Sequence, residues 1–459
     1  MYSVKDPVKK NKDGRNLKMA NVKEYYKEHL VSMKEAAQSI KSGETIWFGS
    51  TLCVPYAFLE ELADRYDELT DMTLMANMYL VPTRVMTDAK YKDHFHVISM
   101  FGNVMERTAQ AKGGNIDFWP VAYGKMVQAV TEIYKANVVC VEVCPMDENG
   151  KFNTGVLGTN FTPNIMRHPG ITKRIAVVNK YQPIATGAES VTQYNVEDFD
   201  YIVENDHDIP SLPVTAPTEF DKAIAEHIIP YIHDGDTVQI GMGGLGNQIA
   251  YELASKKDLN IFTEIGTDAM IGLGEAGVIK KISMAGSFGT KELYHWLGKR
   301  TDLTNLLDVD DVLVPNAVAK QDNIVAINAT FQNDITGQAC SEAQGPIEYS
   351  GVGGSFAFLA GAPEAKNGRS FLCLRSTHPN KSGGQITNIH ALLPEGSVVT
   401  TPRFLVQYIV TEYGVADVYL RTIKDRIRRI IRIAHPDFRE DLKAKAIAAG
   451  LMTEEDFNL

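Results

Sequence analysis

An acidic residue follows directly on an apolar run in NIFTEIGTDAM, residues 260–270. This places Glu264 at the predicted carboxyl end of a strand, the edge at which open α/β sheets bind their ligands. A carboxylate at such an edge can act as a covalent nucleophile. A lone Glu can also be a helix cap or a surface charge, although Asp268, four residues on, is better placed as the N-cap of the next helix.

A glycine-rich segment, IGMGGLGNQ at residues 240–248, lies between a predicted strand and a predicted helix. Glycines let backbone N–H groups come close to a ligand, and the N-terminus of a helix adds partial positive charge. The segment lacks the Lys-Ser/Thr ending of a Walker loop. It is therefore either a ligand-binding loop of another kind or a plain tight turn.

A second glycine-rich segment, YSGVGGSFAFLAGA at residues 349–362, contains Gly351, Gly353 and Gly354 ahead of an apolar stretch. Paired backbone amides there could form an oxyanion hole, and the alternative is a glycine-rich β-turn. The histidines have neither a metal-binding spacing nor a Ser-His-Asp order, so we predict no metal site and no histidine-based hydrolysis.

The elements that must position these segments are strands alternating with helices. TIWFGS, VVCVEVCP, RIAVVN, TVQIGMG, LNIFTEIG, DNIVAINATF and SFLCLRST read as strands, whereas AYELASKK and PRFLVQYIVTEYG read as helical or mixed. This alternation predicts an α/β architecture with largely parallel sheets.

An internal repeat indicates that one domain has been duplicated. IKSGETIWFGS at 40–50 resembles IHDGDTVQIGM at 232–242, and Gly43 aligns with Gly235. The chain of 459 residues is too long for one ordinary core. A proline-rich polar stretch at 205–219 is the natural boundary. We therefore predict two similar domains, residues 1–213 and 214–459.

Composition narrows the class of protein. A net charge of −11 argues against nucleic acid as a partner, but not against a phosphorylated ligand held in a local basic pocket. No stretch is long and apolar enough for a membrane helix, and the lysine-rich N-terminus lacks a secretory signal, so we expect a cytoplasmic protein. The five cysteines are predicted to be buried thiols.

Taken together, these segments resemble the family I coenzyme A transferases, in particular the branch with acetyl-CoA hydrolase/transferase, 4-hydroxybutyrate CoA-transferase and butyryl-CoA:acetate CoA-transferase. The resemblance covers nearly the whole chain in order. Its most specific segments are ITGQACSE at 335–342, VTEYGVA at 410–416 and AHPDFRE at 434–440. It implies two open α/β/α domains related by duplication, in agreement with the repeat.

The resemblance also implies roles for individual residues. Glu264 matches the catalytic glutamate, and Asn328 lies where the family has an active-site asparagine. The family's CoA-contacting loops and a CoA-contacting lysine match Gly241, Met242, Gly243, Gly244, Leu245, Gly353, Gly354 and Lys381.

The chain departs from the family pattern near the expected acyl site. Phe262 and Thr263 precede the glutamate, and residues 355–360 read SFAFLA where relatives have an Asp and an Arg. These changes remove charge, which predicts a pocket for a longer or more apolar acyl group.

The implied activity is ping-pong transfer of CoA between an acyl-CoA and a short carboxylic acid such as acetate, butyrate or 4-hydroxybutyrate, through a glutamyl-CoA thioester. CoA is the cosubstrate, and no other cofactor and no metal are expected. A homo-oligomer is expected. An acyl-CoA hydrolase using the same glutamate and a non-catalytic CoA-binding protein are the alternatives.

Overall fold

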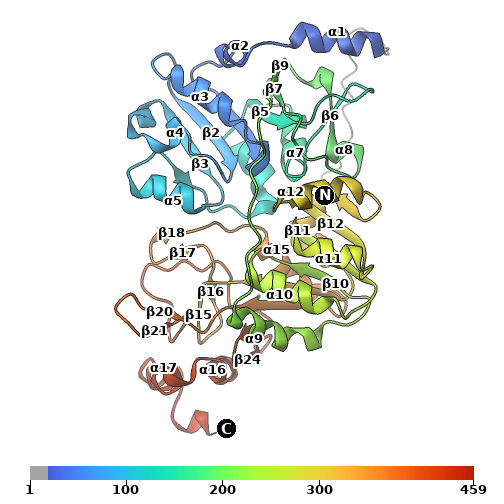
Figure 1. Cartoon of the computed structure of the whole chain (residues 1–459). Coiled ribbons are helices and arrows are strands. Elements are labelled where there is room, and N and C mark those ends of the chain that lie inside the picture. Colours follow the sequence, from blue (N-terminus) through green and yellow to red (C-terminus); the bar gives the residue numbers. More distant parts are fainter. Residues whose placement is uncertain (1–18, 459) are drawn as a thin grey trace.

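Strand β1 (Thr45–Ser50) is a central strand of the first of two large sheets in the computed structural model, which describes residues 19–458 (Figure 1). Apolar side chains on both faces of this strand are buried, as expected for a parallel sheet covered by helices on each side. The first 18 residues, in which the sequence predicts no secretory signal, lie outside the described part of the chain.

The first sheet has seven strands and the second has eight. In spatial order the first sheet contains β4 (Asp117–Phe118), β3 (Phe95–Ser99), β2 (Met72–Asn77), β1, β5 (Val138–Val143), β7 (Lys173–Val178) and β9 (Tyr201–Glu204). The second contains β13 (Thr304–Leu306), β12 (Ile279–Ser287), β11 (Leu259–Gly266), β10 (Thr237–Ile240), β14 (Ile324–Ala329), β19 (Arg369–Cys373), β23 (Tyr408–Thr411) and β24 (Gly414–Asp417).

The two sheets have the same strand order through their first seven strands, and of the strand pairs within these two sheets only β23–β24 is antiparallel in the described residues. We call residues 19–204 the first half and residues 219–458 the second half. Residues 205–218 join them without a helix or strand, and the predicted division after residue 213 falls in this segment. In Figure 1 the first half lies above the second and the joining segment runs between them. The predicted fold class, two similar open α/β/α units, is confirmed.

The repeated sequence motif adopts the same turn in both halves. Gly43 and Gly235 have φ values of +80° and +83°, a left-handed conformation that glycine adopts without steric cost. Their N–H groups donate to Thr70 O at 2.9 Å and to Lys257 O at 3.0 Å. The motif is therefore the turn that starts the central strand of each sheet.

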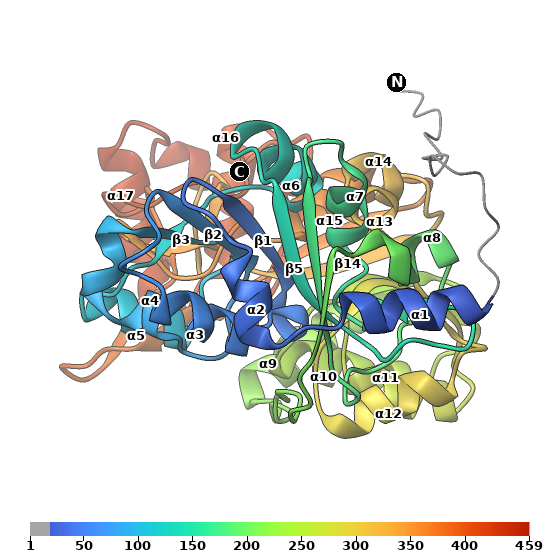
Figure 2. The same ribbon diagram turned by 90° about the horizontal axis from the view of Figure 1, so that it is seen from above.

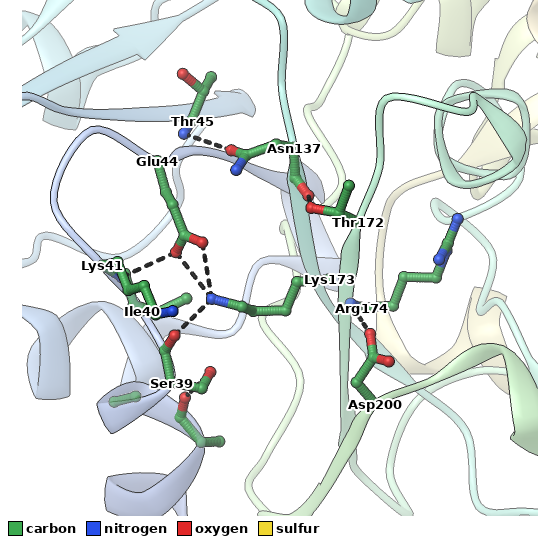
Figure 3. Close-up of polar contacts among 12 residues, drawn as sticks. Ser39, Ile40, Lys41, Glu44, Thr45, Asn137, Thr172, Lys173, Arg174 and Asp200 are labelled. Carbon is green, nitrogen blue, oxygen red and sulfur yellow. Dashed lines mark hydrogen bonds and ion pairs between the residues drawn. The ribbon is translucent and has the colours of Figure 1, made fainter.

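An ion pair below the central strands is duplicated as well. In the first half, Lys173 Nζ lies 2.8 Å from Glu44 Oε1 and donates to Ser39 O at 2.5 Å (Figure 3). In the second half, Arg369 Nη2 lies 3.0 Å from Asp236 Oδ2, and the guanidinium also donates to the carbonyl of Tyr231. Each cation is the first residue of its strand, β7 or β19. The duplication thus extends from strand order to individual contacts.

Helices cover the sheets of both halves (Figures 1 and 2). Those of the first half are α1 (Met19–His29), α2 (Met33–Gln38), α3 (Tyr56–Asp64), α4 (Arg84–Thr87), α5 (Val104–Ala111), α6 (Met126–Gln128), α7 (Thr162–Arg167) and α8 (Glu189–Thr192). Those of the second half are α9 (Glu219–Ile228), α10 (Gly244–Leu253), α11 (Ala269–Glu275), α12 (Lys291–Lys299), α13 (Val309–Val312), α14 (Pro315–Val318), α15 (Ser355–Gly361), α16 (Ile423–Arg432) and α17 (Pro436–Ala448).

One hydrophobic core crosses from half to half. It contains Trp47 and Val141 of the first sheet together with Phe262, Ala326 and Phe358 of the second half. Burying these side chains in one cluster fixes the two halves against each other, because apolar surface would otherwise face water. The strand ends of the second sheet therefore meet the first half at a packed junction.

One local feature differs from the sequence-based expectations. Residues 402–414, expected to be helical or mixed, contain no helix, and β23 and β24 form an antiparallel pair there, because Ile409, Val410 and Thr411 are β-branched and buried. The five cysteines are all free and buried, as predicted. None of the helices in residues 19–458 combines the length and apolarity needed to cross a membrane.

Candidate active site

Glu264 lies near the carboxyl end of β11, next to the central strand of the second sheet. A pocket of about 190 Å³ opens around it. The pocket is lined by Phe101, Gln239, Ile240, Gly241, Met242, Thr263, Glu264, Ile265, Asn328, Ala329, Ser341, Ser350, Gly351, Val352, Gly353, Gly354 and Ser355. Glu264 is the one residue of this lining whose side chain ionises near neutral pH. A single carboxylate thus faces a small, otherwise uncharged pocket.

The second glycine loop holds the carboxylate directly. Gly354 N–H donates to Glu264 Oε2 at 3.1 Å, and it is the carboxylate's one hydrogen-bond partner among the described residues. A Cβ atom at Gly354 would lie 2.3 Å from Glu264 Oε2, so a side chain at this position would displace the carboxylate. Gly353 has φ +61°, which favours glycine for the turn that presents the neighbouring amide. The loop therefore acts as a hydrogen-bond donor and not as a plain turn.

Burial raises the pKa of Glu264 to about 7, and the hydrogen bond from Gly354 acts in the opposite direction. Desolvation penalises the charged form of a carboxyl group, and the pocket lining supplies no cation to offset it. A carboxylate with a raised pKa is more basic than an exposed glutamate and remains ionised above neutral pH. These properties suit a nucleophile.

Asn328 projects from β14 beside the glutamate's strand neighbour β10. Its Nδ2 donates to Gln239 Oε1 at 2.9 Å, and both side chains line the pocket. Gln239 interrupts the otherwise apolar strand TVQI, and this interruption was the one sequence signal that could have identified it. The pair provides amide groups beside Glu264 without adding charge.

The first glycine loop contributes only part of its predicted residues to the pocket. Gly241 and Met242 line it, whereas Gly243 is the N-cap of α10, and Gly244 and Leu245 form the first turn of that helix. Gly241, Gly243 and Gly246 stand at the G-x-G-x-x-G spacing of phosphate-binding turns. A Cβ at Gly246 would lie 2.0 Å from Gly241 O, so this glycine lets the helix pack closely on the strand end.

Lys381 lies apart from these residues. It occupies the exposed turn between β20 (Thr377–Pro379) and β21 (Gln385–Thr387) and does not line the pocket. The structure brings together Glu264, Asn328, Gly241, Met242, Gly353 and Gly354.

The apolar character of the pocket comes from residues other than those expected. Phe262 is buried beneath the strand end, where its ring lies 6.3 Å from that of Phe358 in the shared core, and neither lines the pocket. Phe101, Met242, Ile265 and Val352 supply the apolar surface instead. Phe101 comes from the first half, just after β3, and no local sequence pattern marks it.

Asp268 occupies the N-cap position of α11 but does not cap the helix with its side chain. Its carboxylate accepts hydrogen bonds from the Thr290 N–H, at 3.1 Å, and from the Thr290 hydroxyl. The predicted N-cap position is therefore confirmed, but the side chain does not bond to the helix. Asp268 ties the end of β11 to the start of α12.

The geometry of the site agrees with the similarity of this chain to known proteins. Residues 14–213 match the family model of the acetyl-CoA hydrolase/transferase N-terminal domain, and residues 289–446 match that of the C-terminal domain. The chain is 33% identical to succinyl-CoA:cyclohexane-1-carboxylate CoA transferase of Geobacter metallireducens, over 94% of this chain and 98% of the relative. It is 32% identical to 4-hydroxybutyrate coenzyme A transferase of Clostridium kluyveri, over 91% and 97%. The crystal structure of RipA from Yersinia pestis superposes with a TM-score of 0.84 at 28% identity, over 94% and 100%.

Proposed function

The chain belongs to the acetyl-CoA hydrolase/transferase family and is a CoA transferase, and on that premise we propose that it works through a glutamyl-CoA thioester formed on Glu264. The observation that carries the proposal is the position of this carboxylate. It is the pocket's single ionisable group, it lies at the carboxyl edge of the sheet, and it accepts a hydrogen bond from a glycine loop.

The first half of the reaction proceeds in two steps. A Glu264 oxygen attacks the acyl-CoA carbonyl carbon, forming a C–O bond while the C–S bond breaks, which leaves a mixed anhydride and CoA thiolate. The thiolate then attacks the Glu264 carbonyl carbon and expels the first carboxylate. The product is a glutamyl-CoA thioester, and no proton is gained or lost.

The second half reverses these steps with a different acid. The incoming carboxylate attacks the glutamyl thioester carbonyl and releases CoA thiolate, which takes the new acyl group from the anhydride and restores Glu264. The free energy of the thioester bond is retained throughout. CoA is the cosubstrate, and the mechanism assigns no step to a metal or another cofactor.

Each step passes through a tetrahedral oxyanion, and the pocket offers amide donors for it. Gly354 N–H already lies within hydrogen-bonding distance of the glutamate, and Asn328 has a second N–H beyond the one given to Gln239. One such donor contributes about 3 kcal/mol to the stability of a transition state. Because no cation lines the pocket, these neutral donors carry the stabilisation.

We propose short monocarboxylic acids as the substrates. The pocket volume of about 190 Å³ suits a small acyl group, and its apolar side chains lie beside the nucleophile. A dicarboxylate such as succinate would place a second charge among uncharged groups, which is costly without a cation. Butyrate should therefore be a better acceptor than succinate at equal concentration, and a preference for succinate would contradict this assignment.

A single-turnover burst tests the covalent mechanism. The enzyme is mixed with a small excess of acyl-CoA and with no free acid. Ping-pong transfer predicts that about one equivalent of the free acid is released per active site while CoA stays on the protein, because the first half-reaction is complete without an acceptor. Rapid transfer between two different acids without such a burst would contradict it. Thiol release that does not depend on any acid would indicate hydrolysis instead.

A further inference from the structure

The loop that carries Gly354 begins at Tyr349, directly after β18 (Ile347–Glu348), and runs to α15. Its own half holds only the start of the loop through the backbone. The N–H groups of Tyr349 and Ser350 both donate to Glu342 O, at 2.7 and 3.0 Å. The stretch between this anchor and Gly354 needs further support, because glycine fixes its backbone poorly.

The first half supplies that support. Gly102 N–H donates to Ser350 O at 2.8 Å, across the junction between the halves. Gly351 packs so closely on the first half that a Cβ there would lie 2.4 Å from Met100 O. Two segments far apart in the sequence thus share one backbone hydrogen bond and one close contact directly beside the pocket.

Arg107 fastens this contact from helix α5. Its guanidinium lies 3.8 Å from the centroid of the Tyr349 ring, and its Nη1 donates to Tyr349 O. The same nitrogen lies 3.5 Å from Gly102 O, so one side chain reaches the backbone on both sides of the junction. The edge-to-face partner of Tyr349 is Phe331, at 5.0 Å between centroids, just after the strand that carries Asn328.

The chemistry of this contact is specific to arginine. Arg107 is half-buried and forms no ion pair with the described residues, so its donors are directed at backbone carbonyls and its face at an aromatic ring. A planar guanidinium can stack and donate at once, whereas an ammonium group has no face to stack. An arginine used in this way holds a loop rather than balancing a charge.

We propose that Arg107 is a positioning residue for CoA transfer, which clamps the loop 349–354 so that Gly354 N–H stays directed at Glu264. This inference rests on the function proposed above for Glu264. It gives the first half a share in catalysis through the loop, without contact with the reacting atoms. The lining of the substrate pocket by Phe101, six residues before Arg107, comes from the same part of the first half.

The test uses the full-length enzyme with Arg107→Met, Arg107→Lys and Tyr349→Leu. The rate of adduct formation on Glu264 in a single turnover should fall about tenfold in each, less than the loss of a whole oxyanion donor, while the KM for acyl-CoA changes little. The low-pH limb of the rate profile should move to higher pH, because the hydrogen bond from Gly354 that lowers the pKa of the carboxyl group is weakened. Tyr123, the ionisable side chain on the neighbouring turn, donates instead to Asn77 and is not expected to titrate in this range.

Arg65→Met provides the matched control. Arg65 also donates to two backbone carbonyls, those of Ala37 and Ile40, but wholly within the first half. The Arg65→Met variant should lose thermal stability, while the low-pH limb of its rate profile stays at the wild-type position. The double variant Arg107→Met/Tyr349→Leu should be no slower than the slower single variant, since both remove one contact.

The two claims fail separately. A wild-type enzyme that turns over without any adduct on Glu264 contradicts the covalent mechanism. Arg107→Met and Tyr349→Leu variants that turn over at the wild-type rate, or that lose activity only in proportion to the Arg65→Met control with an unmoved pH limb, contradict the clamp.

Discussion

The two halves of the molecule have equivalent ion pairs at the amino-terminal ends of their sheet strands and differ at the carboxyl ends of these strands. At the base, Glu44 and Lys173 in one half correspond to Asp236 and Arg369 in the other. At the opposite ends of the strands, Asn77 of β2 occupies the position that Glu264 has in β11. The registers show this equivalence, because Thr73 pairs with Thr45 of β1, Asn260 pairs with Thr237 of β10, and the two central strands share the repeated motif. The two halves thus share one scaffold, whereas the proposed nucleophile occurs in the second half and not at the equivalent position of the first.

The other site positions show the same contrast. By register, Gln239 corresponds to Trp47 and Asn328 to Val141. Trp47 and Val141 are buried in the core that joins the halves, while Gln239 and Asn328 line the pocket. Asn77, in place of the nucleophile, accepts a hydrogen bond from Tyr123 Oη at 2.8 Å. In the first half, the corresponding strand ends pack in the core between the halves. This packing places Phe101 in the lining of the pocket and Arg107 against the loop 349–354 of the second half.

The largest effect should come from removing the carboxylate of Glu264, because Asn77 at the equivalent position of the first half has none. Glu264→Gln keeps the shape of the side chain but leaves no nucleophilic carboxylate, so transfer should fall by about 10⁴-fold or more. Steady-state transfer assays with butyryl-CoA and acetate measure this. Glu275→Gln, an exposed glutamate at the end of α11, is the control and should keep full activity. Substantial transfer by Glu264→Gln would break the contrast between the halves.

The next largest effect should come from the amide donor. Gly354→Ala would place a methyl group 2.3 Å from Glu264 Oε2 and 2.8 Å from a Leu313 methyl, so the loop or the carboxylate must move. We expect kcat to fall by about 10²-fold, the effect of losing one such donor. Gly272→Ala in α11 meets no atom within 4 Å and should leave kcat unchanged. Equal kcat values for the two variants would show that the position of this amide is unimportant.

The pKa of Glu264 is raised to about 7, so the reaction rate should depend on pH. Asn77, at the equivalent position of the first half, has no carboxyl group to titrate. The ionised form is the nucleophile and this pKa is that of the enzyme without substrate, so kcat/KM should be constant above about pH 8 and fall roughly tenfold per unit well below pH 7. The folded state binds the proton more tightly than the unfolded state, so this group lowers stability as pH rises from about 4.5 to 7. Rate profiles from pH 5.5 to 9 measure the first effect, and a flat profile would contradict it.

The smallest effect on activity should come from the two ion pairs at the bases of the sheets. Lys173→Met and Arg369→Met each leave a largely buried carboxylate without its partner, which should cost about 3 kcal/mol of stability in its own half. Hydrogen exchange of peptides from β7 and β19 measures these losses separately. Activity per folded molecule should stay at the wild-type level in both. Loss of activity in Arg369→Met alone would show that the base of the second sheet is coupled to the site.

Much of the second half could be predicted from local sequence. The strand LNIFTEIG was predicted with the bounds that β11 has, and the strand-end position of Glu264 followed from it. The duplication was predicted because the glycines at 43 and 235 and the acids that follow them repeat at the same spacing, and both glycines form the same turn. These features depend on residues close together in the chain, and their patterns are therefore visible in it.

The remaining features depend on contacts between distant residues. Phe101 and Arg107 reach the site only because the first half packs against the loop 349–354, some 240 residues later. Phe262 was expected beside the substrate because it lies two residues before Glu264, but it packs deeper in the sheet, against Phe358 in the shared core. Asp268 was expected to cap a helix, and Thr290 of another element takes its carboxylate instead.

Trapping of the intermediate tests the assignment of Glu264 most directly. The enzyme is mixed with an acyl-CoA, treated with borohydride and measured by intact and peptide mass spectrometry. A glutamyl-CoA thioester would be reduced to the alcohol, so the peptide with Glu264 should lose about 14 Da while other peptides keep their mass. An unchanged Glu264 in enzyme that still transfers CoA would contradict the account.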